Sequence, residues 1–521
     1  MAQVINTNVP SLNAQRNLTK SQASLSRTLE RLSTGLRINS AKDDAAGLGI
    51  SERFTSQIRG LNQATRNAND GISLAQTAEA VLASAGDILQ RMRELAVQAA
   101  NATNSFSDRQ ALQDEVNQLN LELDRIAVDS EFNGKKLFDG TFGSAKFQIG
   151  ANSYQTISVN NTNLRTNKYG NNLVTAGGME AFAAAPPAWG VNGVGAENVT
   201  IRGYLGNVGD TSTAIAIDAG PPADTARDVA TKINARTNET GVTANARTEM
   251  LMEFSETGSY SLNLTSENIT YTADPPTAEP LTVNFTIGDP PTTADSLAAA
   301  VTAINDISAK TGITAEIGQD PTTGADKILL TNATGNDIMI EAMNLPPTGT
   351  GTVSVQKMHR NQSAELTAVG AAAVTLAAAN NGLTITGYLQ FDSTHGFMVT
   401  SDLAGAGMIP ADEAAVMNVM AELDVTSFET ATQALKTVDA GIAIVSAQRS
   451  LLGAIQSRFD STVKNLMSTS ENLTAARSRI QDADFAVETA ELTRSQILQQ
   501  AGVSVLSQAN QTPQNTLKLL Q

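Results

Sequence analysis

The chain has 521 residues, a formal net charge of −17 and a hydrophobic content of 41%, which suits about two to five domains with their own cores. It contains no cysteine, which excludes disulfides, thiolate metal sites and a cysteine nucleophile. Aromatic residues make up only 4%, so the cores must be built from Leu, Ile, Val and Ala. That composition favours close helix packing over a bulky enzyme interior.

The N-terminal residues MAQVINTNVPSLNAQRN contain no charged region followed by an apolar one, so no Sec-type signal is expected. No apolar run approaches the ~20 residues that a membrane helix needs, and no membrane partner is expected. The chain is therefore expected in the cytosol, unless it leaves by a route that does not read such a signal.

Two long helices are predicted in the first hundred residues. The first carries leucines at steps of seven, four, three and four residues: Leu18, Leu25, Leu29, Leu32 and Leu36. The second carries a similar apolar series from Ile58 to Ala96. Sustained spacing of this kind without proline predicts helices with a coiled-coil seam.

The segment INSAKDDAAGLGIS between these helices predicts a break or hinge. The residues that mark it are Asp43, Asp44, Gly47 and Gly49. We expect the helix to resume near Ser51.

Beyond residue 100 the segment NATNSFSD predicts a loop, with Ser107 capping a third helix. The dipeptides Asn133-Gly134 and Asp139-Gly140 and the residue Gly150 then separate short alternating runs such as KFQIG and QTISVN. These runs predict β-hairpins.

The middle of the chain differs from both ends in composition. Thirteen of the 15 prolines lie between Pro186 and Pro410. Residues 180–425 hold 9 Lys and Arg against 28 Asp and Glu, a net charge of −19, whereas the two flanks together carry +2. The segment Ala223–Ala244 aligns without a gap with Ala294–Ala315. Strand-like pieces flank both copies, so we predict two β-α-β-β modules.

Apolar residues then recur at roughly seven-residue steps from Leu435 to Val487, which predicts one helix of ~80 Å. The whole pattern predicts an α+β multidomain fold. Its N- and C-terminal helices pair into a long coiled-coil or helical-bundle rod with a β-hairpin. The rod carries inserted β-rich outer domains that contain the repeated β-α-β-β module.

A search for catalytic constellations finds none: the phosphate-binding loop, the HExxH zinc motif and the GxSxG elbow are all missing. We therefore expect no enzyme, no metal site and no cofactor. The net charge disfavours a nucleic-acid partner, although residues 1–45 carry +3.

Several motifs at both ends resemble bacterial flagellin. At the N-terminal end these are INTNVPSLNAQRNL, RLSTGLRINSAKDDAAGLGIS, LQRMRELAVQAANATNS and FNGKKLFDG; at the C-terminal end, DADFAVETAELTRSQILQQAGVSVLSQANQTPQNTLKLL. The resemblance covers about residues 1–165 and 430–521, and the repeated segments of the middle resemble a small insert motif of the same family.

The resemblance implies the subunit of the bacterial flagellar filament, which polymerises outside the cell for swimming and is exported by the flagellar type III system without a cleaved signal. It also implies three domains. The inner helical domain would comprise 1–44 and 483–521, and the rod domain 45–178 and 422–482. The β-rich outer domains would comprise 179–421, with repeats at about 198–273 and 281–342.

The implied partners are further copies of the chain, an export chaperone, and the filament cap and junction proteins. The residues expected to pack in the filament core are Leu18, Leu25, Leu29, Leu32, Leu36, Val503, Leu506, Leu517, Leu519 and Leu520. Toll-like receptor 5 of vertebrates is a further implied partner. The residues that would contact this receptor, by resemblance, are Gln90, Arg91, Leu95, Gln98 and Glu115. Cytosolic immune receptors would recognise the terminal leucines.

Three alternatives remain open at this point. A hook-filament junction protein of the same superfamily shares the terminal helices and the export route. An enzyme carried on a filament would need a catalytic residue set, and the sequence offers none. Adhesion or glycan display by the Ser- and Thr-rich middle is compatible with a filament subunit.

Overall fold

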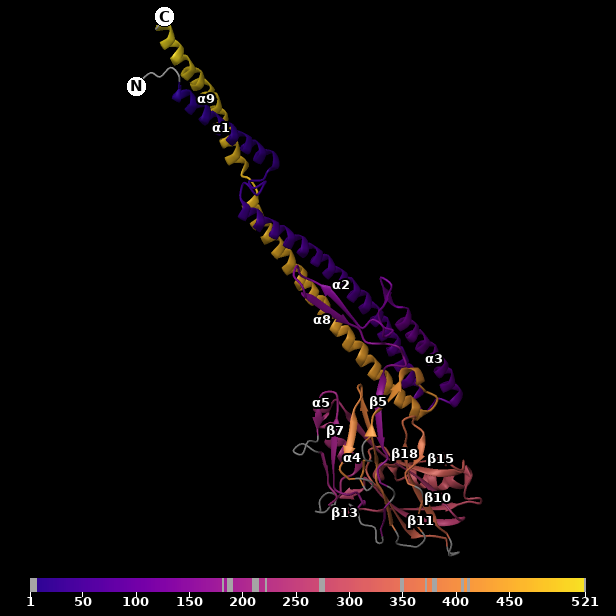
Figure 1. Cartoon of the computed structure of the whole chain (residues 1–521). Coiled ribbons are helices and arrows are strands. Elements are labelled where there is room, and N and C mark those ends of the chain that lie inside the picture. Colours follow the sequence, from indigo (N-terminus) through magenta and orange to yellow (C-terminus); the bar gives the residue numbers. More distant parts are fainter. Residues whose placement is uncertain are drawn as a thin grey trace. The chain divides into compact units, whose positions relative to one another are not determined.

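A computed structural model describes residues 7–179, 182–184, 191–208, 215–220, 223–270, 277–346, 351–370, 373–376, 382–403, 407–409 and 413–519 (Figure 1). The chain divides into two compact units. Unit 1 takes in 1–79, 143–160 and 451–521, and unit 2 takes in 80–142 and 161–450. Two long helices, α2 (Ala45–Ala99) and α8 (Phe428–Gln481), contribute residues to both units.

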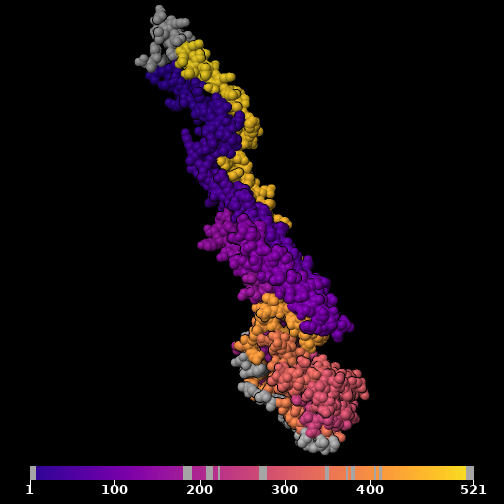
Figure 2. Space-filling view, turned by 90° about the vertical axis from the view of Figure 1, so that its right-hand side faces the viewer, coloured from indigo at the N-terminus to yellow at the C-terminus, as the bar shows by residue number. Residues whose placement is uncertain are grey.

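Unit 1 contains the two ends of the chain. Helix α1 (Val9–Thr34) packs along α9 (Phe485–Leu519), and the space-filling view shows these segments in contact (Figure 2). The first part of α2, the second part of α8 and the hairpin of β3 (Ser144–Gln148) and β4 (Thr156–Asn160) complete the unit. At their centre Phe459 of α8 meets Phe147 of β3 edge to face, with ring centroids 5.7 Å apart. The predicted pairing of helices from the two ends is confirmed.

Both long helical series are bounded by aspartates. Helix α2 begins at Ala45, six residues before the expected start, because Asp44 accepts the backbone N–H of Gly47 at 2.8 Å and so satisfies a free donor of the first turn. The predicted continuous helix from Leu435 to Val487 is wrong. Helix α8 ends at Gln481, and Asp484 accepts the N–H of Ala486 at 2.9 Å to start α9.

Helix α8 also contains an 18-residue window with a mean hydropathy of 1.3, which is long and apolar enough to cross a membrane by composition alone. A third of that window is buried inside the protein. Core helices of soluble proteins pass the same test, so one such window is weak evidence for a membrane span.

Two glycines of α2 provide a matched test of packing in unit 1. A Cβ at Gly71 would lie 2.6 Å from Cζ of the buried Phe459 ring, whereas a Cβ at Gly49 would meet nothing within 4 Å. We expect Gly71→Ala to destabilise the protein by about 1–3 kcal/mol through overpacking. Gly49→Ala should stabilise it by up to about 1 kcal/mol, because alanine is the better helix former. Thermal unfolding followed by far-UV circular dichroism measures both, and equal shifts would contradict this account.

The helical part of unit 2 combines the rest of α2 and α8 with α3 (Phe106–Asp129). The predicted cap at Ser107 is wrong, because Ser105 caps α3. The two residues form a capping box: the Ser105 hydroxyl accepts the backbone N–H of Asp108, and the Asp108 carboxylate accepts the backbone N–H of Ser105. The sequence favours neither serine by composition, but only Ser105 has an acidic residue three positions later. The hairpin of β1 (Glu131–Phe132) and β2 (Lys135–Lys136) turns at Asn133 and Gly134, both with positive φ, as predicted.

The β-rich part of unit 2 contains three larger sheets among the described residues. In the first, the order is β15-β16-β10-β22-β5-β25, with β18 pairing β10, β19 and β20. Its strands are β5 (Gly170–Ala176), β10 (Thr243–Phe254), β15 (Ile313–Gln319), β16 (Asp326–Asn332), β18 (Val353–Arg360), β19 (Leu366–Ala368), β20 (Val374–Leu376), β22 (Tyr388–Ser393) and β25 (Val416–Val419).

The second sheet has the order β14-β11-β17-β21-β6, and the third has β24-β23-β7-β8 with β9 on β7. The strands of the second are β6 (Phe182–Ala184), β11 (Gly258–Thr265), β14 (Leu281–Ile287), β17 (Ile338–Asn344) and β21 (Gly382–Ile385). Those of the third are β7 (Glu197–Arg202), β8 (Asn207–Val208), β9 (Ile215–Ile217), β23 (Met398–Ser401) and β24 (Glu413–Ala414). The short strands β12 (Ile269–Thr270) and β13 (Thr277–Ala278) pair with each other, and the turn η1 (Met420–Glu422) precedes α8.

The predicted repeat is visible in atomic detail. Helix α4 (Ala226–Asn234) of the first copy and α6 (Ala294–Asn305) of the second each end in an asparagine. Asn234 exchanges two hydrogen bonds of 2.8 Å with the backbone of Ala244, and Asn305 does the same with Ala315 at 2.9 and 2.8 Å. Each copy then adds one helical turn, α5 (Thr237–Thr240) or α7 (Ser308–Thr311), which ends at a glycine with positive φ.

The two copies nevertheless do not form two separate modules. Strand β10 of the first copy pairs with β16 of the second, and β11 pairs with β14. Helix α4 covers one hydrophobic core of unit 2 and α6 covers another. A strand edge that is unpaired within one copy is therefore hydrogen-bonded to a strand of the other copy. A local sequence pattern cannot specify such a pairing.

Candidate assembly surface

Helices α1 and α9 run antiparallel and are joined by polar contacts at both ends. At one end Asn8 donates to the carbonyl of Ala509 at 2.9 Å, and Ser11 donates to Asn510 at 2.8 Å. At the other end Arg31 forms an ion pair of 3.0 Å with the largely buried Glu488. These contacts fix which faces of the two helices meet.

The buried stripe between α1 and α9 consists of small or polar side chains. Its buried members among the described side chains are Ser11, Ala14, Thr28, Glu488 and Ser495. Gly502 adds to it, since a Cβ there would lie 3.3 Å from Leu18. Small residues let the helices approach closely, but they bury little apolar surface.

The large apolar side chains of the pair are turned outward instead. Val487 is 63% exposed, Leu498 51% and Val505 58%. Val9, Leu12, Phe485 and Ile497 are also exposed. Sequence reasoning placed Val487 in the C-terminal apolar series but missed the other six residues, because they lie off the predicted series. The signal that could have found them is that α9 is apolar on several faces, as expected of a helix that is covered on several sides.

The structure places the predicted filament-core residues in the same region. Leu18, Leu25, Leu32, Leu36 and Leu506 are half-buried, and Leu29 and Val503 are exposed. Leu517 and Leu519 lie in the last turns of α9, where the backbone alone is described, and Leu520 lies outside the described residues. We define the apolar assembly surface as the exposed residues Val9, Leu12, Leu29, Phe485, Val487, Ile497, Leu498, Val503 and Val505.

The predicted hinge residues connect α1 with α2. Gly35 ends α1 with a φ of +72°, and its carbonyl accepts the N–H of Ala483, which ties the connection to the start of α9. Asp43 accepts two hydrogen bonds from Ser40, and these lower the pKa of its carboxyl group. Gly47 and Gly49 lie inside the first turns of α2, not in the connection.

The predicted receptor residues lie in unit 2 on α2 and α3. Gln90, Arg91 and Gln98 are exposed on α2, and Glu115 is exposed on α3. Arg91 bonds Glu115 at 2.8 Å and Glu94 at 3.0 Å, and the first of these bonds raises the pKa of Arg91 most. Leu95 is 1% exposed, so its side chain is turned away from solvent, unlike the other four. An exposed pair such as Arg91–Glu115 contributes little to stability and is available to a partner.

The fold and the assembly surface together define the class of protein. The helices at the two ends of the chain pair with each other, and a β-rich insertion lies between them in the sequence. The paired helices expose apolar side chains that the single chain does not cover. Exposed apolar surface of this kind marks a site of protein association.

Comparison with known proteins gives the family. Residues 5–143 match the model of the bacterial flagellin N-terminal helical region, residues 435–520 that of the C-terminal helical region, and residues 198–268 the flagellin hook IN motif. The chain is 40% identical to B-type flagellin of Pseudomonas aeruginosa and 37% identical to flagellin of Salmonella typhimurium, each over 100% of both chains. It is 34% identical to flagellin A of Vibrio cholerae over 99% of both chains.

The chain therefore belongs to the bacterial flagellin family. It is a structural subunit of the flagellar filament, a component that lies outside the cell. The resemblance stated from the sequence is confirmed.

Proposed function

We propose that the chain polymerises by burying its apolar assembly surface against neighbouring copies, and that the resulting filament serves swimming motility. The observation that carries this proposal is the outward orientation of Val487, Leu498 and Val505 on α9. Covering one such side chain contributes about 1.5–3 kcal/mol, so several of them per subunit supply a large driving force.

The proposal assigns the inner filament domain to 1–44 and 483–521, the rod domain to 45–178 and 422–482, and the outer domains to 179–421. It includes export through the flagellar type III system without a cleaved signal. It also includes transient binding to an export chaperone, to the filament cap and to junction proteins. The −19 charge of residues 180–425 supports an outer position, because like-charged surfaces stay solvated and repel one another.

Electron microscopy of the full-length protein beside a version that ends before Ala483, both in polymerising salt, tests the proposal. We expect long filaments from the full-length chain only. Normal filaments from the truncated chain would overturn the role of α9. If the full-length chain fails to grow even on filament seeds, the junction-protein alternative is favoured.

Recognition by toll-like receptor 5 is a second proposed function, carried by the exposed group of Gln90, Arg91, Gln98 and Glu115. The terminal leucines are proposed to be read by cytosolic immune receptors. We expect Arg91→Ala to weaken receptor binding by monomeric protein about tenfold or more, since arginine is frequent among dominant interface residues. Arg125→Ala on α3 is the control, because Arg125 is also an exposed arginine and is ion-paired with Glu122. Surface plasmon resonance with the receptor ectodomain measures both, and equal losses would contradict the assignment.

A further inference from the structure

Strand β14 forms one edge of the second sheet in unit 2. Among the described residues it pairs with β11 alone, so the backbone groups along its other side have no strand partner there. Edge strands of natural proteins are usually blunted by a short length, a charge, a proline or a bulge. Strand β14 has none of these devices: its seven residues, LTVNFTI, contain no charge and no proline, and its register with β11 is unbroken.

The other edges of the three larger sheets, in the part of the chain that the structure describes, are charged or shorter. Strand β15 is equally long but carries Glu316, and β25 has four residues. The remaining edge strands have two or three residues each: β6, β8, β9, β19, β20 and β24. A long, uncharged edge is therefore peculiar to β14 among these strands, although residues 180–425 carry a net charge of −19.

The sequence of β14 is nearly a palindrome about Asn284. A second copy of the strand, placed antiparallel about this residue, would bring similar side chains opposite one another. Apolar residues would meet on the buried face of the sheet and polar residues on its exposed face. Aromatic residues opposite β-branched ones, and threonine opposite threonine, stabilise a sheet. The facing pairs are Leu281 with Ile287, Thr282 with Thr286, Val283 with Phe285, and Asn284 with itself.

We infer that β14 is an interface between copies of this chain, in which the strand pairs antiparallel with its counterpart about Asn284. Each strand then offers the same backbone donors and acceptors to the other, as in any two-fold interface. Two five-stranded sheets become one continuous sheet through main-chain hydrogen bonds. No charged side chain of either strand has to be desolvated, because β14 has none.

A second copy is the occupant that this edge suits best. One short pair of strands is only marginally stable in water, so the partner must be present at a high local concentration. A filament supplies such a concentration of identical chains. The inference therefore rests on assembly into a filament, but it goes beyond the apolar assembly surface, because β14 belongs to unit 2 and not to α1 or α9.

Cysteine cross-linking tests the interface, because the chain has no cysteine of its own. Directly opposite residues of an antiparallel pair have Cα atoms ~4.5–5.5 Å apart, a distance that a disulfide can bridge. We expect Asn284→Cys to form covalent dimers on mild oxidation. Thr282→Cys is the matched control, because residue 282 is exposed on the same face. Its two copies would be offset by four residues, or ~13 Å, which is too far for a disulfide.

A mixture of two variants checks the register. Residue 282 of one copy faces residue 286 of the other, so Thr282→Cys and Thr286→Cys should cross-link when mixed, although neither should do so alone. Adding Asn284→Lys to both chains should suppress this cross-link, because two ammonium groups would then lie directly opposite each other.

Oxidation is carried out on sedimented filaments and on the soluble chain at the same total concentration. Sedimentation measures polymerisation, and a denaturing gel measures the cross-link separately. Filaments of Asn284→Cys without covalent dimer would overturn the inference and leave polymerisation intact. Equal amounts of dimer from Asn284→Cys and Thr282→Cys would also overturn it, because parallel stacking or random collision joins both. If no filament forms, dimer specific to Asn284→Cys in the soluble chain supports the pairing, and its absence there overturns it.

Discussion

The double substitution Leu498→Glu and Val505→Glu should abolish filament growth while the monomer stays folded. Both side chains are more than half exposed in the single chain, so the charges cost the monomer little. In a polymer they would have to be buried, and an unpaired buried carboxylate costs several kcal/mol. Each variant subunit therefore loses two apolar contacts and gains two desolvation costs, and both changes oppose assembly.

Sedimentation of polymer at increasing protein concentration measures this effect, with circular dichroism of the monomer to verify the fold. Leu205→Glu is the matched control, because Leu205 is 56% exposed in the β-rich part of unit 2 and lies outside the assembly surface. We expect the control to polymerise normally. Filaments of the double variant at the wild-type critical concentration would disprove the role assigned to α9.

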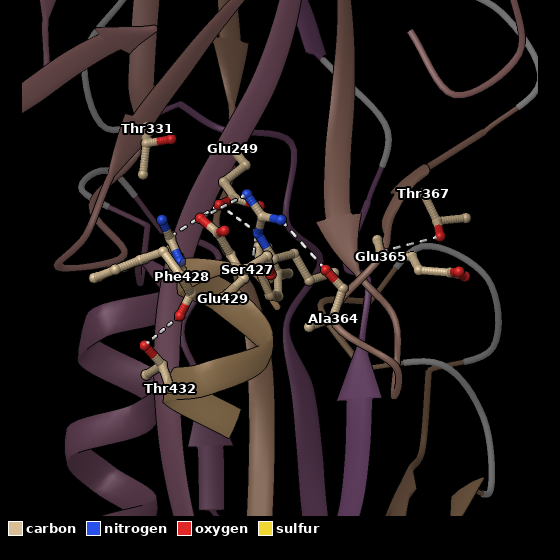
Figure 3. Close-up of polar contacts among 12 residues, drawn as sticks. Glu249, Thr331, Ala364, Glu365, Thr367, Ser427, Phe428, Glu429 and Thr432 are labelled. Carbon is tan, nitrogen blue, oxygen red and sulfur yellow. Dashed lines mark hydrogen bonds and ion pairs between the residues drawn. The ribbon is translucent and has the colours of Figure 1, made fainter. Parts of the chain in front are cut away.

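Glu249→Ala should give the largest loss of stability in unit 2. Glu249 on β10 is 0% exposed and lies among the polar contacts drawn in Figure 3. Its carboxylate accepts hydrogen bonds from Arg360 at 3.1 Å and from the Tyr388 hydroxyl at 3.3 Å. Arg247 lies 2.9 Å from the same carboxylate, and Arg360 also reaches Glu429 in the first turn of α8 at 3.3 Å. The network therefore fastens α8 to the first sheet within unit 2.

Removing Glu249 leaves two arginines without their shared partner. Burial lowers the pKa of Arg360, but Glu249 and Glu429 more than reverse this, so the guanidinium stays charged. Breaking a buried pair from one side costs about 3–5 kcal/mol. We therefore expect amide hydrogen exchange in β10 and β18 to accelerate about 100-fold or more.

Glu253→Ala is the control, because Glu253 lies on the same strand and pairs with Lys327 at 2.8 Å but is 44% exposed. Its loss should cost less than about 1 kcal/mol. If the two variants exchange at similar rates, the network carries no special stability.

Local signals in the sequence were sufficient for several elements. The leucine series predicted α1, the Asn-Gly pair predicted the turn between β1 and β2, and the gapless repeat predicted equivalent helices α4 and α6. Each of these depends on residues within a few positions of one another. The family resemblance lay in the same local motifs at both ends.

Contacts between distant residues were beyond such signals. The periodic apolar residues from Leu435 to Val487 predicted one helix, but the backbone contact of Ala483 with Gly35 and the cap by Asp484 divide it. Similarly, the repeat could not reveal that β10 pairs with β16, since hydrogen-bonding edges of strands have no sequence pattern of their own. The burial of Glu249 likewise depends on Arg360 and Tyr388, which lie 111 and 139 residues away in the sequence.

The helical ends, the acidic β-rich insertion and the family follow from the amino-acid sequence, because periodicity, composition and motifs are properties of neighbouring residues. The set of apolar side chains that stay uncovered depends on how distant segments pack. Helices α1 and α9 meet along Ser11, Ala14 and Ser495, and this narrow contact leaves Leu498 and Val505 exposed. Which stripe of a helix is buried depends on its partner, and that partner is hundreds of residues away.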